Sequence, residues 1–181
     1  MKFHINTVSS IFIALAGILS IQQTAHSAVL LGKINFELHG MVVAYSCGVV
    51  DSETEKYIDL GKHATKSLSS AGTKSTLVPI PFDLTNCPPN GTVNITFTGN
   101  KDSINTELLA IDKNANSAKN IAIEISDKNK KRIPIGVKSE NMSVDNNGNI
   151  STLFYANYIV TEGSSTAGLA NANAQFTIQY D

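Results

Sequence analysis

The sequence predicts an all-β protein that folds as an antiparallel β-sandwich. Helical periodicity is weak throughout the chain beyond its first 27 residues. Short runs rich in β-branched and aromatic residues recur there instead, and Gly, Asn, Asp, Ser and Pro separate them. In three of these runs, 92–99, 120–126 and 174–180, large apolar side chains alternate with polar or small ones. Such alternation is typical of strands with one buried face.

Residues 1–27 have the pattern of a secretory signal peptide. Lys2 supplies a positive charge, 11–21 form an apolar run of 11 residues, and small residues precede the expected cut before Ala28. The apolar run is too short to span a bilayer. A cut after Ala28 and a buried N-terminal helix are the alternatives. We expect the chain to be exported and leave 1–27 out of the fold.

Residues 28–39 begin the exported chain with alternating large apolar side chains. Lys33, Asn35 and Glu37 fall on the opposite face of an extended segment. Two interpretations are open: an edge strand of the same domain, or a strand that pairs with a different molecule. The residues that share the apolar face are Leu30, Gly32, Ile34, Phe36 and Leu38.

The expected strands follow in order within 40–181, a length that suits one domain. Each is a run of β-branched or aromatic residues between turn residues. In 120–126, Ile121, Ile123 and Ile125 share the expected buried face, while Ala122 and Glu124 lie opposite. The candidate strands are MVVAYSCGVV (41–50), KYIDLG (56–61), STLVPIPFDLTNC (75–87), TVNITFTG (92–99), ELLAI (107–111), NIAIEIS (120–126), RIPIGV (132–137), STLFYANYIV (151–160) and AQFTIQY (174–180).

The connections between these strands have the composition of turns. DKNKK (127–131) and DNNGN (145–149) predict hairpin turns. The basic stretch KNKKR (128–132) is interpreted as a solvated hairpin tip rather than a binding patch. A long loop of small residues, 161–173, precedes the last strand, and nothing in it suggests chemistry.

Cys47 and Cys87 are the two cysteines of the chain. An even count in an exported protein suggests one disulfide. Closing a loop of about 40 residues would stabilise the fold by roughly 4 kcal/mol in the chain-entropy model. There is no CxxC motif, so a redox or metal role for the pair has little support.

Charge and motifs argue against several function classes. The chain carries 14 basic and 15 acidic residues without a basic patch, so nucleic acid is not an expected partner. No GxSxG, HExxH or phosphate-binding glycine loop occurs. Beyond the signal peptide only His39 and His63 remain, and both are interpreted as surface residues. We expect no enzyme activity, no metal, no cofactor and no small-molecule substrate.

The order of motifs along the exported chain resembles a structural subunit of chaperone–usher fimbriae, the type 1 and P pilin family. The second cysteine falls where a pairing with the first requires it. The ELHG stretch places two extra residues before the domain compared with common rod subunits, so the register of the extension stays open. The resembling motifs are GKINF (32–36), GMVVAYSC (40–47), IDLG (58–61), PIPFDLTNCP (79–88), ITFTG (95–99), LFYANYIVT (153–161) and AGLANANAQFTIQY (167–180).

The resemblance implies the pilin fold, an incomplete immunoglobulin-like sandwich that lacks its final strand. Residues 40–181 would form the pilin domain, and 28–39 would be a donor-strand extension that fills the open core of a neighbouring subunit. The groove would lie beside the last strand, at Ala174, Phe176, Ile178, Tyr180 and Asp181.

The resemblance also implies partners and a location. A periplasmic chaperone would lend a strand to the groove, and its basic residues would hold the terminal carboxylate of Asp181. At the outer-membrane usher, the next subunit's extension would replace that strand, which yields a cell-surface fimbrium of a Gram-negative bacterium. The sequence does not separate a main rod subunit from a minor adaptor.

Two other function classes stay open. A secreted, self-contained β-sandwich binding module, for instance a lectin-like one, would pair its N-terminal strand within its own domain. Such a module should fold alone as a monomer, which discriminates it from a subunit with an open core. A secreted hydrolase is disfavoured by the missing catalytic motif.

Overall fold

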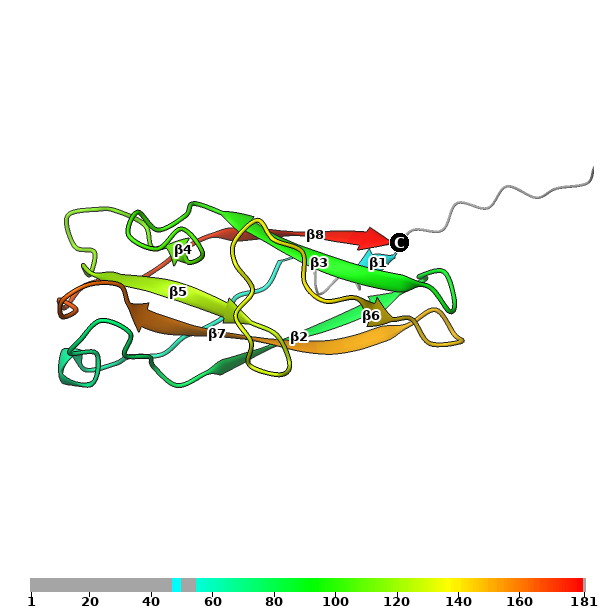
Figure 1. Ribbon diagram of the computed structural model, residues 1–181, viewed down its shortest axis with the longest axis horizontal. Helices are drawn as coiled ribbons and strands as arrows, with labels where there is room; N and C mark the ends of the chain where they lie inside the picture. The colour runs from blue at the N-terminus through cyan, green and yellow to red at the C-terminus, as the bar shows by residue number, and fades with distance from the viewer. Residues whose placement is uncertain (1–46, 50–54, 181) are drawn as a thin grey trace, which may run out of the picture. The chain divides into compact units, whose positions relative to one another are not determined.

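A computed structural model of the chain describes residues 47–49 and 55–180, which form two packed β-sheets (Figure 1). The predicted signal peptide (1–27), the predicted extension (28–39) and Asp181 lie outside the described residues. One sheet has the strand order β1-β2-β7-β5-β4 and the other β6-β3-β8. The elements are β1 (Gly48–Val49), the 3₁₀ turn η2 (Thr65–Ser67), β2 (Val78–Thr85), β3 (Thr92–Gly99), β4 (Leu109–Ala110), β5 (Ile121–Ser126), β6 (Met142–Ser143), β7 (Ile150–Val160) and β8 (Ala174–Tyr180).

All pairs of named strands run antiparallel, as predicted. β7 is the central strand of the larger sheet and pairs with β2 on one edge and β5 on the other. In the smaller sheet, β3 lies between β6 and β8. The described part of the chain has no helix with the length and hydropathy that a membrane span requires.

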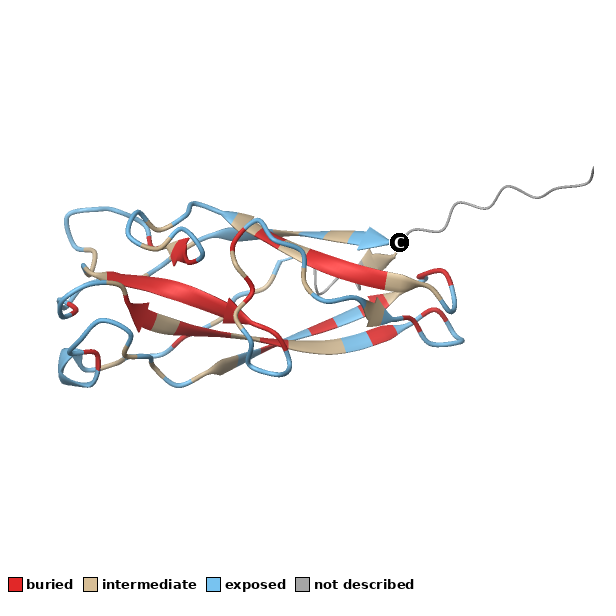
Figure 2. Cartoon of the chain, viewed as in Figure 1, coloured by how far each residue is buried: buried red, intermediate tan, exposed pale blue. Residues whose placement is uncertain are grey.

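Four phenylalanines, one from each of β2, β3, β7 and β8, join the two sheets. The Phe82 ring lies edge-to-face on three others, with centroid distances of 4.9 Å to Phe176, 5.4 Å to Phe154 and 6.0 Å to Phe97. Edge-to-face contacts add to the free energy gained by burying the rings. Buried residues are concentrated along β3, β5 and β7, whereas β8 is mostly exposed or intermediate (Figure 2).

Two predicted strands are absent from the described structure, and one strand was not predicted. The run 132–137 forms one bridge, at Arg132, and a turn instead of a strand, because Pro134 has no N–H for a ladder and turn geometry follows it. The run 56–61 is not assigned to a strand, although the burial of its side chains alternates. The short β6 was missed because two residues carry no periodic signal.

The predicted solvent face of β5 is wrong, because all six of its residues are buried. Leu108 packs against Ala122 and Ile159 on the outer face of the sheet. Glu124, only 3% exposed, is held by ion pairs with Lys74 and Arg132 at 2.6 Å each. Loops therefore cover this part of the sheet as a second layer.

The hairpin turn after β5 is confirmed, but its last basic residue is not solvated as predicted. The Asp127 N–H donates to the Lys131 carbonyl at 2.9 Å, and residues 128–131 are exposed. Arg132 instead reaches back to Glu124 and also donates to Glu107 at 3.0 Å. The turn at 145–149 is confirmed as well, with the Asp145 N–H bonded to the Asn149 carbonyl.

Candidate functional site

Within the part of the chain that the structure describes, β8 is an edge strand with one open side. It pairs with β3 along its whole length, from Ala174 opposite Gly99 to Tyr180 opposite Val93. Among residues 47–49 and 55–180, no strand pairs with its other side. An unpaired strand edge presents a row of backbone N–H and C=O groups to which another strand can bond. We refer to this side of β8 as the open edge.

The side chains of β8 are less buried than their partners on β3. Ile95 is 0% exposed, but Ile178, directly opposite, is only partly buried. Phe97 is likewise buried, whereas its partner Phe176 is partly buried. Because both strands contribute to the same core, the difference in burial lies at the open edge.

The remaining predicted groove residues follow the same strand. Ala174 is exposed, and Tyr180, although in register with the inward-facing pair, is 51% exposed. The alternation of Phe176, Ile178 and Tyr180 on one face is present as the sequence predicts. Asp181 and the predicted donor residues Leu30, Gly32, Ile34, Phe36 and Leu38 lie outside the described residues, so their roles stay predictions.

The segment 55–60 contributes to the same core without forming a ladder. Ile58 and Leu60 pack on the main cluster to which Phe176 and Ile178 also belong. Lys56 is the third side chain on this inward face, and its Nζ lies 5.0 Å from the centre of the Phe82 ring. Burial lowers the pKa of Lys56, and the nearby carboxylate of Asp83 opposes this shift. Sequence reasoning missed Lys56, although the alternation in KYIDL could have revealed it.

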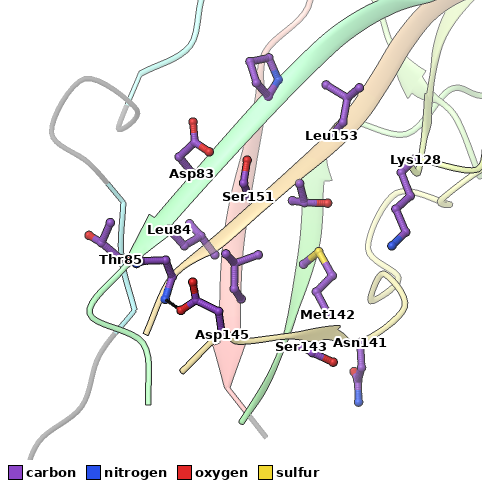
Figure 3. A pocket seen from close by; sticks show the side chains of 14 residues that line it. Asp83, Leu84, Thr85, Lys128, Asn141, Met142, Ser143, Asp145, Ser151 and Leu153 are labelled. Atoms are coloured by element: carbon purple, nitrogen blue, oxygen red, sulfur yellow. Dashed lines mark hydrogen bonds between the residues drawn. The ribbon is translucent and has the colours of Figure 1, made fainter. Parts of the chain in front are cut away.

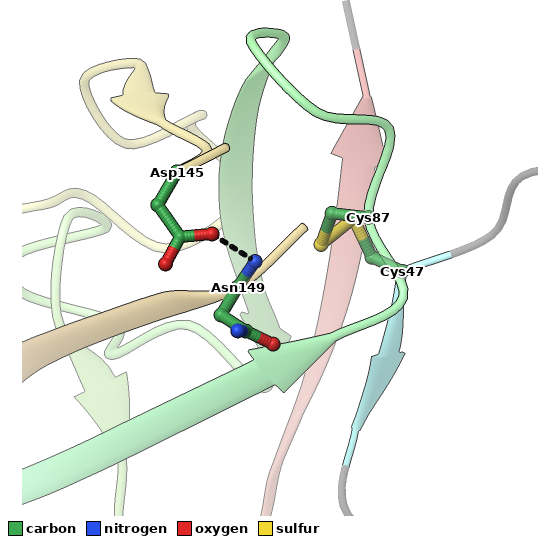
Figure 4. Close-up of a disulfide and its surroundings, with 4 residues drawn as sticks. All are labelled: Cys47, Cys87, Asp145 and Asn149. Atoms are coloured by element: carbon green, nitrogen blue, oxygen red, sulfur yellow. Dashed lines mark hydrogen bonds between the residues drawn. A yellow bond between two sulfur atoms is a disulfide. The ribbon is translucent and has the colours of Figure 1, made fainter. Parts of the chain in front are cut away.

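The predicted disulfide is confirmed: Cys47, just before β1, is bonded to Cys87 in the connection from β2 to β3 (Figure 4). The Cys87 N–H donates to the Gly148 carbonyl at 2.9 Å. A side chain at Gly148 would press on the Cys87 carbonyl oxygen, and its φ of 78° also favours glycine. The turn 145–149, whose Asp145 carboxylate accepts from the Asn149 N–H at 2.7 Å, is thereby fixed against the disulfide.

A cavity of about 920 Å³ lies between β6 and the strands β2 and β7 (Figure 3). No residue of β3 or β8 lines it, so it is distinct from the open edge. Its charged lining groups are Asp83, Lys128 and Asp145, and neither histidine nor cysteine lines it. Asp145 is already engaged by the N–H groups of its own turn. The cavity therefore carries no nucleophile and base in hydrogen-bonded contact.

The described residues contain no group of three or more His, Cys, Asp or Glu side chains that could hold a metal ion. His63 has a structural contact: its Nε2 lies 2.8 Å from the Leu60 carbonyl oxygen, and its ring packs edge-on against Tyr158. His39 lies outside the described residues. The open edge, where β8 has no strand partner among the described residues, is therefore the candidate functional site.

Comparisons with known proteins agree with the two-sheet fold. A family model described as fimbrial protein matches residues 34–181. The fimbrial-like protein FimF of Salmonella typhimurium is 42% identical over 151 residues, which cover 83% of this chain and 86% of that protein. The P pilus rod subunit PapA superposes with a TM-score of 0.61 at 20% identity over 75% of this chain and 99% of that one. A subunit of a chaperone–usher pilus gives a TM-score of 0.64 at 21% identity over 83% and 97% of the two chains.

Proposed function

The chain belongs to the fimbrial protein family, and from this premise we propose that it is a pilus subunit that polymerises by exchanging β-strands with its neighbours. Members of this family are structural proteins of the bacterial cell surface rather than enzymes. The observation that carries the proposal is the open edge of β8, where Phe176 and Ile178 are only partly buried. A strand added there would complete both the smaller sheet and the core.

The physical driving force is the burial of apolar side chains together with new backbone hydrogen bonds. Large apolar side chains contribute about 1.5–3 kcal/mol each when fully buried. Strand addition supplies the backbone bonds, and pockets for alternate side chains supply specificity. The segment 28–39 has the required pattern, with Leu30, Ile34, Phe36 and Leu38 on one face.

The partners follow from this mechanism. A periplasmic chaperone first covers the open edge with a strand of its own and holds the carboxylate of Asp181. At the outer-membrane usher, the extension 28–39 of the next subunit replaces the chaperone strand. Gly32 leaves one pocket of the groove unfilled, so strand exchange can begin there. The chain both donates and accepts a strand, which suits a position inside the fibre as a rod subunit or adaptor.

The decisive experiment removes the donor while leaving the acceptor intact. The exported chain without residues 28–38 should accumulate with its chaperone but should not cap another subunit. Phe36→Asp, which charges an inward position, should have the same effect, whereas the outward Asn35→Asp should assemble normally. Normal entry of the truncated chain into fibres would contradict the donor assignment. A stable, non-assembling monomer made by the full chain alone would favour the self-contained binding module instead.

A further inference from the structure

The segment 55–60 behaves like a strand in the direction of its side chains, but its first inward position holds a lysine. Ile58 and Leu60 point into the core, whereas Tyr57, 92% exposed, and Asp59 point outward. Lys56 occupies the inward position two residues before Ile58. An apolar side chain is the ordinary occupant of such a position.

Lys56 covers the aromatic centre of the core. Its ammonium stands over the ring of Phe82, which is 1% exposed and also contacts Phe176 of the open edge at a centroid distance of 4.9 Å. A cation over an aromatic face is attracted by the ring, and a lysine stem covers apolar surface while its ammonium reaches water. Lys56 and Phe176 therefore both contact the ring of Phe82.

We propose that Lys56 is a displaceable cover for Phe82, which swings outward when an apolar side chain of an incoming strand takes its place. This inference rests on the proposed function, because it assigns a role in strand capture. A leucine or methionine at this position would fill the space permanently and compete with the incoming side chain. The ammonium group of Lys56 can move away from the Phe82 ring readily, because water and the exposed carboxylate of Asp83 can stabilise its charge.

Peptide-binding kinetics test this role in the full exported chain, residues 28–181. The probe is a fluorescent peptide with the sequence of residues 28–39. Lys56→Ala should bind it about fivefold to tenfold faster, the factor expected from losing a partly desolvated cation–aromatic contact. Lys56→Arg should bind at the wild-type rate because it restores a cation over the ring. The matched control is Lys62→Ala, which removes an exposed lysine of the same stretch and should change nothing.

Nuclear magnetic resonance of the wild-type chain with isotope-labelled lysine provides an independent readout. The Hε signals of Lys56, identified by their loss in Lys56→Arg, should be displaced upfield by the Phe82 ring. Saturation with the peptide should move them to the position typical of the exposed Lys62. This measurement also tests whether the peptide displaces Lys56 if the Lys56→Ala variant does not fold.

The outcomes separate the cover from strand capture itself. The peptide can bind while Lys56→Ala keeps the wild-type rate and the Lys56 signals do not move. That result would refute the role of Lys56 as a cover but would leave the proposal of strand capture intact. If the peptide binds neither the wild type nor Lys62→Ala, the proposed function and this inference both fail.

Discussion

The ring of Tyr180 lies directly against Gly91, the residue just before β3. A Cβ atom at position 91 would overlap the Cε2 and Oη atoms of that ring. Tyr180 is the last residue of β8 and is paired with Val93. Half of the Tyr180 side chain is exposed, and its ring occupies the space that is left by the absence of a side chain at Gly91.

Gly91→Ala should therefore destabilise the end of β8. We expect the free energy of unfolding to fall by at most about 1 kcal/mol, the low end of the overpacking range, because the half-exposed ring of Tyr180 can turn away from the added methyl group. Gly91 is not among the residues with positive φ, so the methyl group meets the ring rather than a backbone restriction. Urea titration of the full chain measures the effect.

A double-mutant cycle identifies the cause of that loss. In a Tyr180→Ala background the ring is gone, and Gly91→Ala should be neutral or should stabilise by about 0.4–1 kcal/mol through the unfolded chain. An equal loss in both backgrounds would show that the ring contact is not responsible.

Sequence reasoning located the two strands that meet at the open edge. β3 and β8 have the predicted bounds, 92–99 and 174–180, because apolar and polar residues alternate along both runs in the sequence, although Asn94 on the predicted outer face of β3 is buried. The disulfide could also be predicted from the sequence, because two cysteines in an exported chain allow only one pairing. The family then supplied the interpretation of the edge, which alternation alone left undecided.

The errors arise where a second layer covers the sheet. Glu124 alternates like a solvent-facing residue, but Lys74 and Arg132 reach it from distant parts of the chain. Lys56 is of a residue type that usually lies at the surface, but it occupies an inward-facing position. Both depend on tertiary contacts, which a local pattern of apolar and polar residues does not record.

Phe176→Ser should lower the amount of the subunit that accumulates in the periplasm. The change removes a ring that contacts Phe82 and an apolar side chain from the open edge, so chaperone capture should weaken. Thr177→Ser, on the exposed face of the same strand, is the control and should accumulate normally. Quantitative immunoblotting with the chaperone co-expressed provides the measurement. Equal amounts of both variants would argue that capture occurs away from β8.

Tyr158 should make stability depend on alkaline pH. Its hydroxyl donates to the Ala170 carbonyl at 2.9 Å, and burial, aided by the carboxylate of Asp59, raises its pKa above 10.0. The unfolded chain then loses this proton first as pH rises, so the stabilisation is complete below pH 10.0 and is lost above it.

Tyr158→Phe tests this dependence. At neutral pH the variant should be less stable by about 1 kcal/mol, since the Ala170 carbonyl loses its donor. The difference between wild type and variant should shrink as pH rises above 10.0, the ordinary tyrosine value. Urea titrations at matched ionic strength across this range give the difference directly. A constant difference would contradict the raised pKa.

Glu124→Ala should be among the more damaging changes on the outer face of the larger sheet. The side chain of Glu124 is 4% exposed and pairs with both Lys74 and Arg132. Its removal leaves two cations without their shared partner, a change that destabilises buried pairs by about 3–5 kcal/mol. Because the cations left behind, Lys74 and Arg132, are partly exposed and Arg132 keeps its contact with Glu107, we expect about 1–2 kcal/mol, below that range.

The matched control for Glu124 is Glu140, whose exposed carboxylate pairs with Lys131 at 2.8 Å. Glu140→Ala should change the free energy of unfolding by less than about 1 kcal/mol, as is usual for surface ion pairs. Similar losses for Glu124→Ala and Glu140→Ala would refute the interpretation of Glu124 as a buried anchor.

Reduction of the disulfide should release β1 before the rest of the fold opens. Among the described residues, two pairs join β1 to β2, Gly48 with Thr85 and Val49 with Leu84, whereas Cys47 is tied covalently to Cys87. In the Cys47→Ser/Cys87→Ser variant we expect a loss of roughly 4 kcal/mol in the chain-entropy model. Amide hydrogen exchange should accelerate most at Gly48 and Val49 and least at Ile123 in the inner strand β5. Uniform acceleration across both sheets would mean that the disulfide supports the whole sandwich rather than its first strand.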